Sequence, residues 1–144
     1  MSTFRVETVL AAPPDDVWDD LRHIDRHVEW MHDAVAIRFT TEAREGVGTA
    51  FDCDTKVGPI RLTDRMEITA WEAGGAMGVR HVGLVTGEGM FTLSPVDGGT
   101  RFVWEETLTF PWWMGGPVGA AVASPVLRFV WRRNLRNLAA RFGG

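Results

Sequence analysis

The sequence is poor in cysteine and has no tyrosine, and each shortage narrows what the protein can be. One cysteine, Cys53, excludes a disulfide framework within the chain and is typical of a reducing compartment. The first residues, MSTFRVETVLAAPP, lack the basic patch and apolar run of a secretory signal, so we expect a cytoplasmic location. Seven Trp and eight Phe without a Tyr give aromatic surface that almost entirely lacks hydroxyl groups. Each buried ring removes about 150–250 Å² from water, so this supply can build a core and still line a pocket.

Acidic residues are absent after Glu106, although the net charge is −4. The net charge argues against non-specific nucleic-acid binding by the whole molecule. The C-terminal part instead carries five arginines, Arg128, Arg132, Arg133, Arg136 and Arg141. This basic end fits either an anionic surface or ligand, or a solvated helix face whose cations oppose the helix dipole.

The longest stretch without a charge runs from Leu108 to Leu127 and is long enough to span a bilayer. Pro111, Pro117 and Pro125 interrupt it, and its first residues continue an alternating strand pattern. We therefore expect no transmembrane span.

Motifs for metals, phosphates and covalent catalysis are missing as well. His23 and His27 have an i, i+4 spacing, but Asp25 is expected to break the helix between them, and His32 completes no known ligand pattern. Gly46-Val-Gly48 lacks the third glycine and the following helix of a dinucleotide loop. The sequence thus predicts no metal and no cofactor.

Most of the chain alternates with a period of two, which predicts seven short strands. The connections between the last six are short, so these strands must run antiparallel. One face of each strand is apolar, and the residues expected on that face are Phe4, Val6, Thr8 and Leu10; Val35, Ile37 and Phe39; Phe51, Cys53, Thr55 and Val57; Ile60, Leu62, Asp64, Met66 and Ile68; Met77, Val79 and His81; Phe91 and Leu93; and Phe102, Trp104, Glu106, Leu108 and Phe110.

Helical periodicity occurs in three places. A short helix should begin at Pro13-Pro14, and a second should follow with Asp25 as its N-cap. A long helix is expected at about 117–142, with Pro125 kinking it or separating a short first segment. We predict one α+β domain, 1–144, in which a curved seven-stranded antiparallel sheet and the long C-terminal helix enclose a cavity.

Short sequence matches occur in the same order as these elements: Ala12-Pro13 before Val17-Trp18, Trp30 after the short helices, Gly46–Gly48 opening a strand, Leu93-Ser94-Pro95 with Gly99-Thr100, and Asn134-Leu135 with Leu138. In these features the chain resembles the START-like superfamily, more narrowly the SRPBCC group of polyketide cyclases, dehydrases and lipid-transport proteins. The resemblance implies a helix-grip fold with a deep cavity between helix and sheet. It supplies no catalytic motif, and fold alone does not give function.

Three ionisable groups, Asp64, His81 and Glu106, fall on the predicted apolar face. In a cavity they could act as general acid and base on a ketone or enol. Alternatively they lie at solvated strand ends or pair structurally, and a one-residue bulge would reverse the direction of Asp64 and His81.

The segment Phe110-Pro-Trp-Trp-Met-Gly-Gly-Pro117 is an unusual loop. Trp112 and Trp113 could gate the cavity mouth and touch a membrane, or pack between the sheet edge and the long helix.

We therefore expect the chain to bind a hydrophobic small molecule, such as a lipid or polyketide, as a carrier or sensor. One alternative is a polyketide cyclase or aromatase that uses Glu106, Asp64 or His81, and another is a partner-binding domain that uses the Trp112-Trp113 loop. The predicted ligand-binding residues are Trp30, Phe51, Met66, His81, Phe91, Trp104, Glu106, Trp112, Trp113, Leu127 and Trp131.

Overall fold

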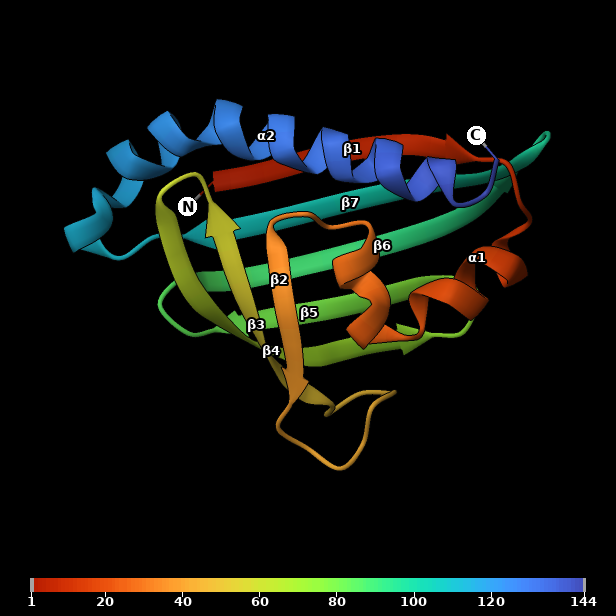
Figure 1. The fold of residues 1–144 in the computed structure, drawn as a ribbon, viewed down its shortest axis with the longest axis horizontal. Helices are drawn as coiled ribbons and strands as arrows, with labels where there is room; N and C mark the ends of the chain where they lie inside the picture. The colour runs from red at the N-terminus through yellow and green to blue at the C-terminus, as the bar shows by residue number, and fades with distance from the viewer. Residues whose placement is uncertain (1, 144) are drawn as a thin grey trace.

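A seven-stranded antiparallel sheet is the largest element of the structure, a computed structural model that describes residues 2–143. Its strands are β1 (Ser2–Leu10), β2 (Ala34–Phe39), β3 (Ala50–Val57), β4 (Ile60–Glu72), β5 (Ala76–Val82), β6 (Thr86–Val96) and β7 (Gly99–Thr109). Their order in space is β1-β7-β6-β5-β4-β3-β2, so the first strand pairs with the last (Figure 1).

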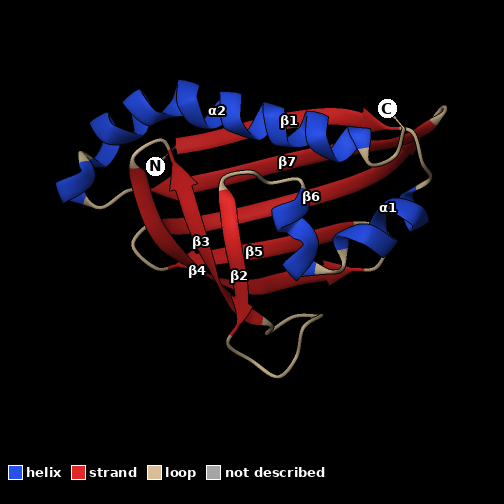
Figure 2. Ribbon diagram, in the orientation of Figure 1, coloured by secondary structure: helices blue, strands red, loops and turns tan. Residues whose placement is uncertain are grey.

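The helices are α1 (Pro14–Leu21), the 3-10 turns η1 (Ile24–Glu29) and η2 (Trp112–Met114), and the long α2 (Gly116–Ala140). Figure 2 shows α2 running along the side of the sheet formed by β1, while α1 lies at one end and η1 lies between α1 and β2, in front of the sheet. α2 packs mainly against β1, and η1 packs against β2. This arrangement confirms the predicted α+β helix-grip fold.

The alternation of buried and exposed residues follows the predicted faces along most strands. In β7, Phe102, Trp104 and Leu108 are buried while their neighbours are more exposed. The prediction was wrong for Val35, whose side chain is 60% exposed. The pairing of β2 with β3 shifts register between Ala34 and Ala36, and this bulge turns Ala34 inward in place of Val35.

One helix prediction was also wrong, and one of the two alternatives for Pro125 is excluded. Asp25 lies inside η1, whose N-cap is His23 and makes no capping side-chain hydrogen bond. α2 continues through Pro125, so no separate first segment forms. Pro125 and Ala121, four residues earlier, are both exposed, so water can satisfy the carbonyl group that loses its N–H partner. None of the helices within residues 2–143 combines the length and apolarity that crossing a bilayer requires.

The packed core and the hollow part lie at different ends of the sheet. Leu10, Val17 and Leu21 pack with Leu135 and Leu138 near the C-terminal end of α2. The N-terminal half of α2 instead covers a cavity.

Candidate functional site

A cavity of about 620 Å³ lies between the sheet and the N-terminal half of α2. Strands β3, β4 and β5 turn every second side chain toward it, and α2 closes it with residues between Val118 and Trp131. Its wall is mostly apolar. The volume lies within the range of about 300–1,000 Å³ that is usual for small-molecule sites.

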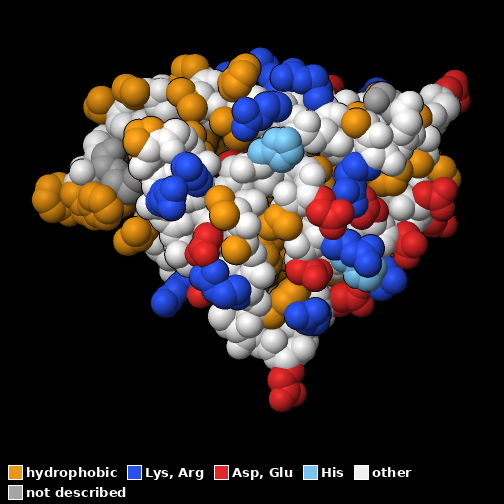
Figure 3. Space-filling model, in the orientation of Figure 1, with side chains coloured by type: hydrophobic (Ala, Val, Ile, Leu, Met, Phe, Trp, Pro, Cys, Tyr) orange, Lys and Arg blue, Asp and Glu red, His pale blue; other side chains and the backbone are white. Residues whose placement is uncertain are grey.

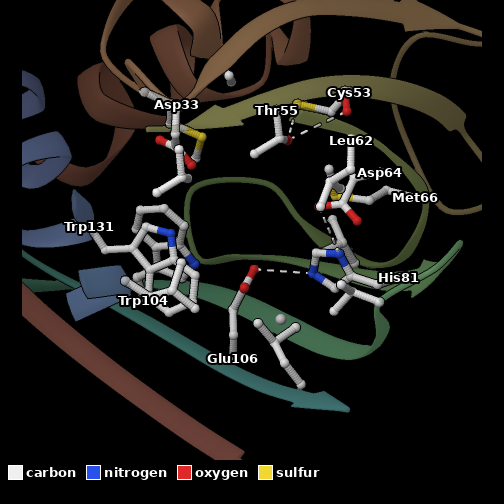
Figure 4. A pocket seen from close by; sticks show the side chains of 18 of the residues that line it. Asp33, Cys53, Thr55, Leu62, Asp64, Met66, His81, Trp104, Glu106 and Trp131 are labelled. Carbon is white, nitrogen blue, oxygen red and sulfur yellow. Dashed lines mark hydrogen bonds and ion pairs between the residues drawn. The ribbon is translucent and has the colours of Figure 1, made fainter. Parts of the chain in front are cut away.

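Most of the residues predicted from the sequence to bind ligand lie on the wall of this cavity. They are Phe51, Met66, His81, Phe91, Trp104, Glu106, Leu127 and Trp131, and Asp64 lies there too. Across the cavity from Asp64 and His81, the rings of Trp104 and Trp131 contact each other at a tilt of 34°, with their centroids 5.1 Å apart (Figure 4).

Trp30 does not line the cavity, contrary to the prediction. Its fully buried indole packs behind the wall, with ring centroids 6.0 Å from Phe91, 6.3 Å from Phe102 and 6.1 Å from Trp104. The residue therefore supports the wall and contributes no surface to the cavity.

Trp112 and Trp113 do not line it either, because η2 directs them away from the cavity. Their exposed fractions are 86% and 58%, so packing between the sheet edge and α2 is wrong for both. The turn after them depends on Gly115, whose φ of 93° only glycine adopts easily. Figure 3 shows hydrophobic side chains gathered at this end of the molecule.

The three candidate ionisable groups form one cluster in the cavity wall. His81 of β5 lies between Asp64 of β4 and Glu106 of β7 (Figure 4). Its Nε2 donates a 3.3 Å hydrogen bond to Glu106 Oε1, and its Nδ1 lies 3.8 Å from Asp64 Oδ2. His81 is 6% and Glu106 8% exposed, so both are screened from bulk water.

The two carboxyl groups control the charge of the imidazole. Burial by itself would lower the pKa of His81, but the hydrogen bond to Glu106 and the charge attraction of Asp64 and Glu106 outweigh it and raise the pKa to about 10. At neutral pH the cavity therefore contains an imidazolium that can donate protons from both nitrogens.

Gly89 of β6 makes room for this cluster and was not predicted. It pairs with Glu106 across the β6–β7 ladder, and a Cβ at this position would lie 2.7 Å from Glu106 Oε1. Any larger residue would therefore displace the Glu106 carboxyl group.

Asn134 is a second polar residue that the sequence patterns did not reveal as functional. It is fully buried on α2; its Nδ2 donates a 2.6 Å hydrogen bond to Asp33 Oδ1, and its Oδ1 accepts one from the His32 backbone N–H. Asp33 lines the cavity, so Asn134 connects α2 to the wall beside η1.

Cys53 and His27 carry two further buried reactive groups, and burial shifts the pKa of each. Burial raises the pKa of the Cys53 thiol to about 12. Burial also lowers the pKa of His27, whose Nε2 lies 2.8 Å from the Leu21 carbonyl oxygen. Within residues 2–143 no three His, Cys, Asp or Glu side chains are grouped to hold a metal ion.

Sheet, helix and interior space together define a helix-grip protein with an apolar cavity. The sequence profile of the family described as "Polyketide cyclase / dehydrase and lipid transport" matches residues 1–143, and the chain belongs to this family. A comparison with curated proteins gives no match.

Solved structures share the fold at low sequence identity. Protein TTHA0849 of Thermus thermophilus superposes with a TM-score of 0.81 at 19% identity, over 98% of this chain and 97% of the other. The di-domain ARO/CYC StfQ from the steffimycin biosynthetic pathway gives 0.78 at 19% identity, over 98% of this chain and 50% of StfQ. Protein CV1439 of Chromobacterium violaceum gives 0.74 at 16% identity, over 100% and 99%.

Proposed function

We propose that this protein binds one hydrophobic small molecule, such as a lipid or polyketide, in the cavity beneath α2 and acts as a carrier or sensor. The observation that carries this proposal is an apolar space of about 620 Å³ with the buried Asp64–His81–Glu106 cluster in its wall. Apolar surface drives binding in such a site, and a few polar groups fix the orientation of the ligand. The family to which the chain belongs supports the same function. The one-domain boundary 1–144 and the cytoplasmic location stay predictions.

The test compares two substitutions on the same helix. Ala123 lines the cavity, whereas Ala121, two residues away, is exposed and does not. N-phenyl-1-naphthylamine, an uncharged dye that fluoresces in apolar sites, should bind the wild type and Ala121→Trp with similar affinity. Ala123→Trp fills part of the space and should weaken binding at least about tenfold, because one large apolar group more or less is worth about 1.5–3 kcal/mol.

Native mass spectrometry of the purified protein would show whether a small molecule co-purifies. Failure of the dye to bind the wild type, or equal binding by both tryptophan variants, would exclude the cavity as the binding site.

A second candidate function, acid–base catalysis of the cyclase type, is favoured by the position of His81 between two carboxyl groups. Glu106 could take a proton from the carbon beside a ketone while His81 gives one to the ketone oxygen, which forms an enol with no net change in charge. StfQ is described as an ARO/CYC protein, which motivates this test.

The probe is 2-acetonaphthone, an apolar ketone whose methyl protons exchange with deuterium through its enol. A protein with this activity should accelerate the exchange seen by NMR, and Glu106→Gln should reduce the acceleration by about 10²–10⁴-fold while dye affinity stays within a few-fold. Equal rates of exchange with and without wild-type protein would exclude this catalytic activity, and ligand binding would be the remaining proposed function.

The exposed apolar end suggests how a ligand reaches the cavity. In Figure 1, η2, the β3–β4 turn and the β5–β6 turn lie at the same end of the molecule. The exposed apolar side chains at this end are Trp112 and Trp113 of η2, Ile60, Val82 and Leu84 at the two turns, and Val118 and Val122 near the start of α2. Segments 56–61, 82–87 and 107–127 contain Lys56 and Arg61 and no acidic residue. Exposed Trp with nearby cations fits transient contact with an anionic membrane surface.

Flotation with vesicles containing anionic lipid tests this contact. Wild-type protein should float with them more than with purely zwitterionic vesicles, and Trp112→Ala/Trp113→Ala should not. Val47→Ala, which changes an exposed apolar residue in the β2–β3 loop, is the matched control. Equal flotation of all three, or self-association through this end in sedimentation experiments, would contradict the membrane contact; capture of one protein partner would favour the partner-binding alternative.

A further inference from the structure

The charges that face the cavity are almost all of one sign. Asp33, Asp64 and Glu106 contribute three carboxyl groups to the wall, and His81 is the one cation among them. His27 also lines the cavity, and burial keeps its imidazole neutral. No Lys or Arg belongs to the wall among the residues the structure describes.

His81 is already shared between two carboxyl groups, so it cannot neutralise an additional anion without competition. A ligand carboxylate placed beside it would also face Asp64 and Glu106, in a largely water-excluded space where like charges repel strongly. Anionic ligands, including free fatty acids, should therefore bind poorly despite their apolar chains.

Two buried polar atoms in the cluster lack a hydrogen-bond partner within residues 2–143. They are His81 Nδ1 and Asp64 Oδ1, and the 3.8 Å between Nδ1 and the other Asp64 oxygen is too long for a hydrogen bond. The protein covers both of these atoms, but the Asp64 side chain as a whole is 17% exposed and lines the cavity, so its carboxyl group can accept a hydrogen bond from a ligand. An under-bonded carboxyl group in a buried site is costly, so a ligand group that donates a hydrogen bond to Asp64 would gain affinity.

A hydroxyl group can donate this hydrogen bond without carrying a charge. A carboxylate or sulfonate can only accept, and a methyl group can do neither. We infer that the cavity selects uncharged hydrophobic molecules with a hydroxyl group, such as a phenol, enol or alcohol, that donates to the Asp64 carboxyl group, and rejects anions of the same shape. This inference rests on the proposed binding function and specifies its ligand class.

Three competitors share the naphthalene ring system and differ in one substituent. They therefore separate the effect of ligand shape on affinity from the effects of charge and hydrogen bonding. 2-Naphthol, 2-naphthoate and 2-methylnaphthalene are each titrated against protein carrying N-phenyl-1-naphthylamine at pH 7. 2-Naphthol should displace the dye at concentrations at least about tenfold lower than 2-naphthoate, since one close like-charge contact is worth a factor of this order. It should also act at several-fold lower concentrations than 2-methylnaphthalene, since one additional hydrogen bond has about that value.

Two variants assign the selectivity to the cluster. Asp64→Asn removes one carboxyl group and should reduce the preference for 2-naphthol over 2-naphthoate several-fold, with little change for 2-methylnaphthalene. Glu88→Gln is the matched control, because it removes an exposed carboxyl group from β6 outside the cavity wall and should preserve the wild-type preference.

The inference is overturned if 2-naphthoate competes as well as 2-naphthol, if 2-naphthol is no better than 2-methylnaphthalene, or if Asp64→Asn leaves the preference unchanged. Each of these outcomes leaves the binding function intact. Absence of dye binding would instead refute the proposed function itself.

Discussion

The pH dependence of stability offers a direct test of the His81 cluster. We consider His81→Gln, in which the amide can still donate to Glu106 but carries no positive charge. A shift in the pKa of His81 from 6.5 to about 10 corresponds to as much as about 5 kcal/mol, at about 1.4 kcal/mol per pKa unit. Solvent that enters the cavity screens part of this attraction, so we expect His81→Gln to lower the free energy of unfolding by about 2–4 kcal/mol at pH 6.

The sign of the pH dependence follows from linkage. The folded protein holds the His81 proton more tightly than the unfolded chain, so the stabilisation is complete below the unfolded pKa of 6.5. It decreases as pH rises from 6.5 and is lost as pH passes the folded pKa of about 10. The difference in stability between wild type and His81→Gln should therefore narrow steadily over this window. Cys53 has a pKa of about 12 when folded and 9.0 when unfolded, so it destabilises both proteins equally above about pH 9 and cancels from the difference.

Urea denaturation of both proteins at intervals from pH 6 to pH 10.5 measures this difference, and NMR of the His81 Hε1 proton gives the pKa itself. His81→Gln assigns the resonance, because the chain has only four histidines. A stability difference that does not change with pH, or a His81 resonance that titrates near pH 6.5, would refute the charge assignment in the cluster.

Three further predictions concern neighbouring residues. Gly89→Ala places a methyl group 2.7 Å from Glu106 Oε1, so the His81 pKa should fall by about one unit in the same NMR titration, and an unchanged pKa would contradict the contact. Cys53, with its raised pKa, should react with Ellman's reagent at pH 8 on the order of 10³-fold more slowly than in urea-unfolded protein; equal rates would be inconsistent with this burial. Asn134→Ala removes two buried hydrogen bonds and should lower the urea-derived free energy of unfolding by about 2–3 kcal/mol; a loss below about 0.5 kcal/mol would show that they contribute little.

The strand pattern predicted the sheet well because period-two alternation is a local property of the chain. Asp64 and His81 face the same side as their apolar neighbours because the register shift between β4 and β5 falls between Ile68 and Ala70, beyond Asp64 and beyond the pair that His81 forms with Met66. The prediction for Val35 was wrong because a bulge at one residue reverses the direction of its side chain. The local alternation of apolar and polar residues does not reveal where such a bulge occurs.

Gly89 could have been found from the sequence. The hairpin signal Asp97-Gly98 sets the register of the strands on either side, with Val96 opposite Gly99, and counting outward from this pair places Gly89 opposite Glu106. The outward direction of Trp112 and Trp113 could not be found this way. It depends on the left-handed turn at Gly115 and on where α2 lies, which are not local properties of two adjacent tryptophans.

The cavity itself arises from an uneven distribution of side-chain size along α2. Between Gly116 and Val126 the helix contains only Gly, Ala, Ser, Pro and Val, whereas the segment from Leu127 to Leu138 includes Phe, Trp, Arg and three Leu. Large side chains fill the space between helix and sheet at the C-terminal end, where the core is packed. Small ones cannot reach the sheet at the other end, although the backbone of one continuous helix spans both. Hydrophobic periodicity treats Ala and Leu alike, so it predicts the helix and its inner face but not the space beneath it; side-chain volume along that face carries the missing information.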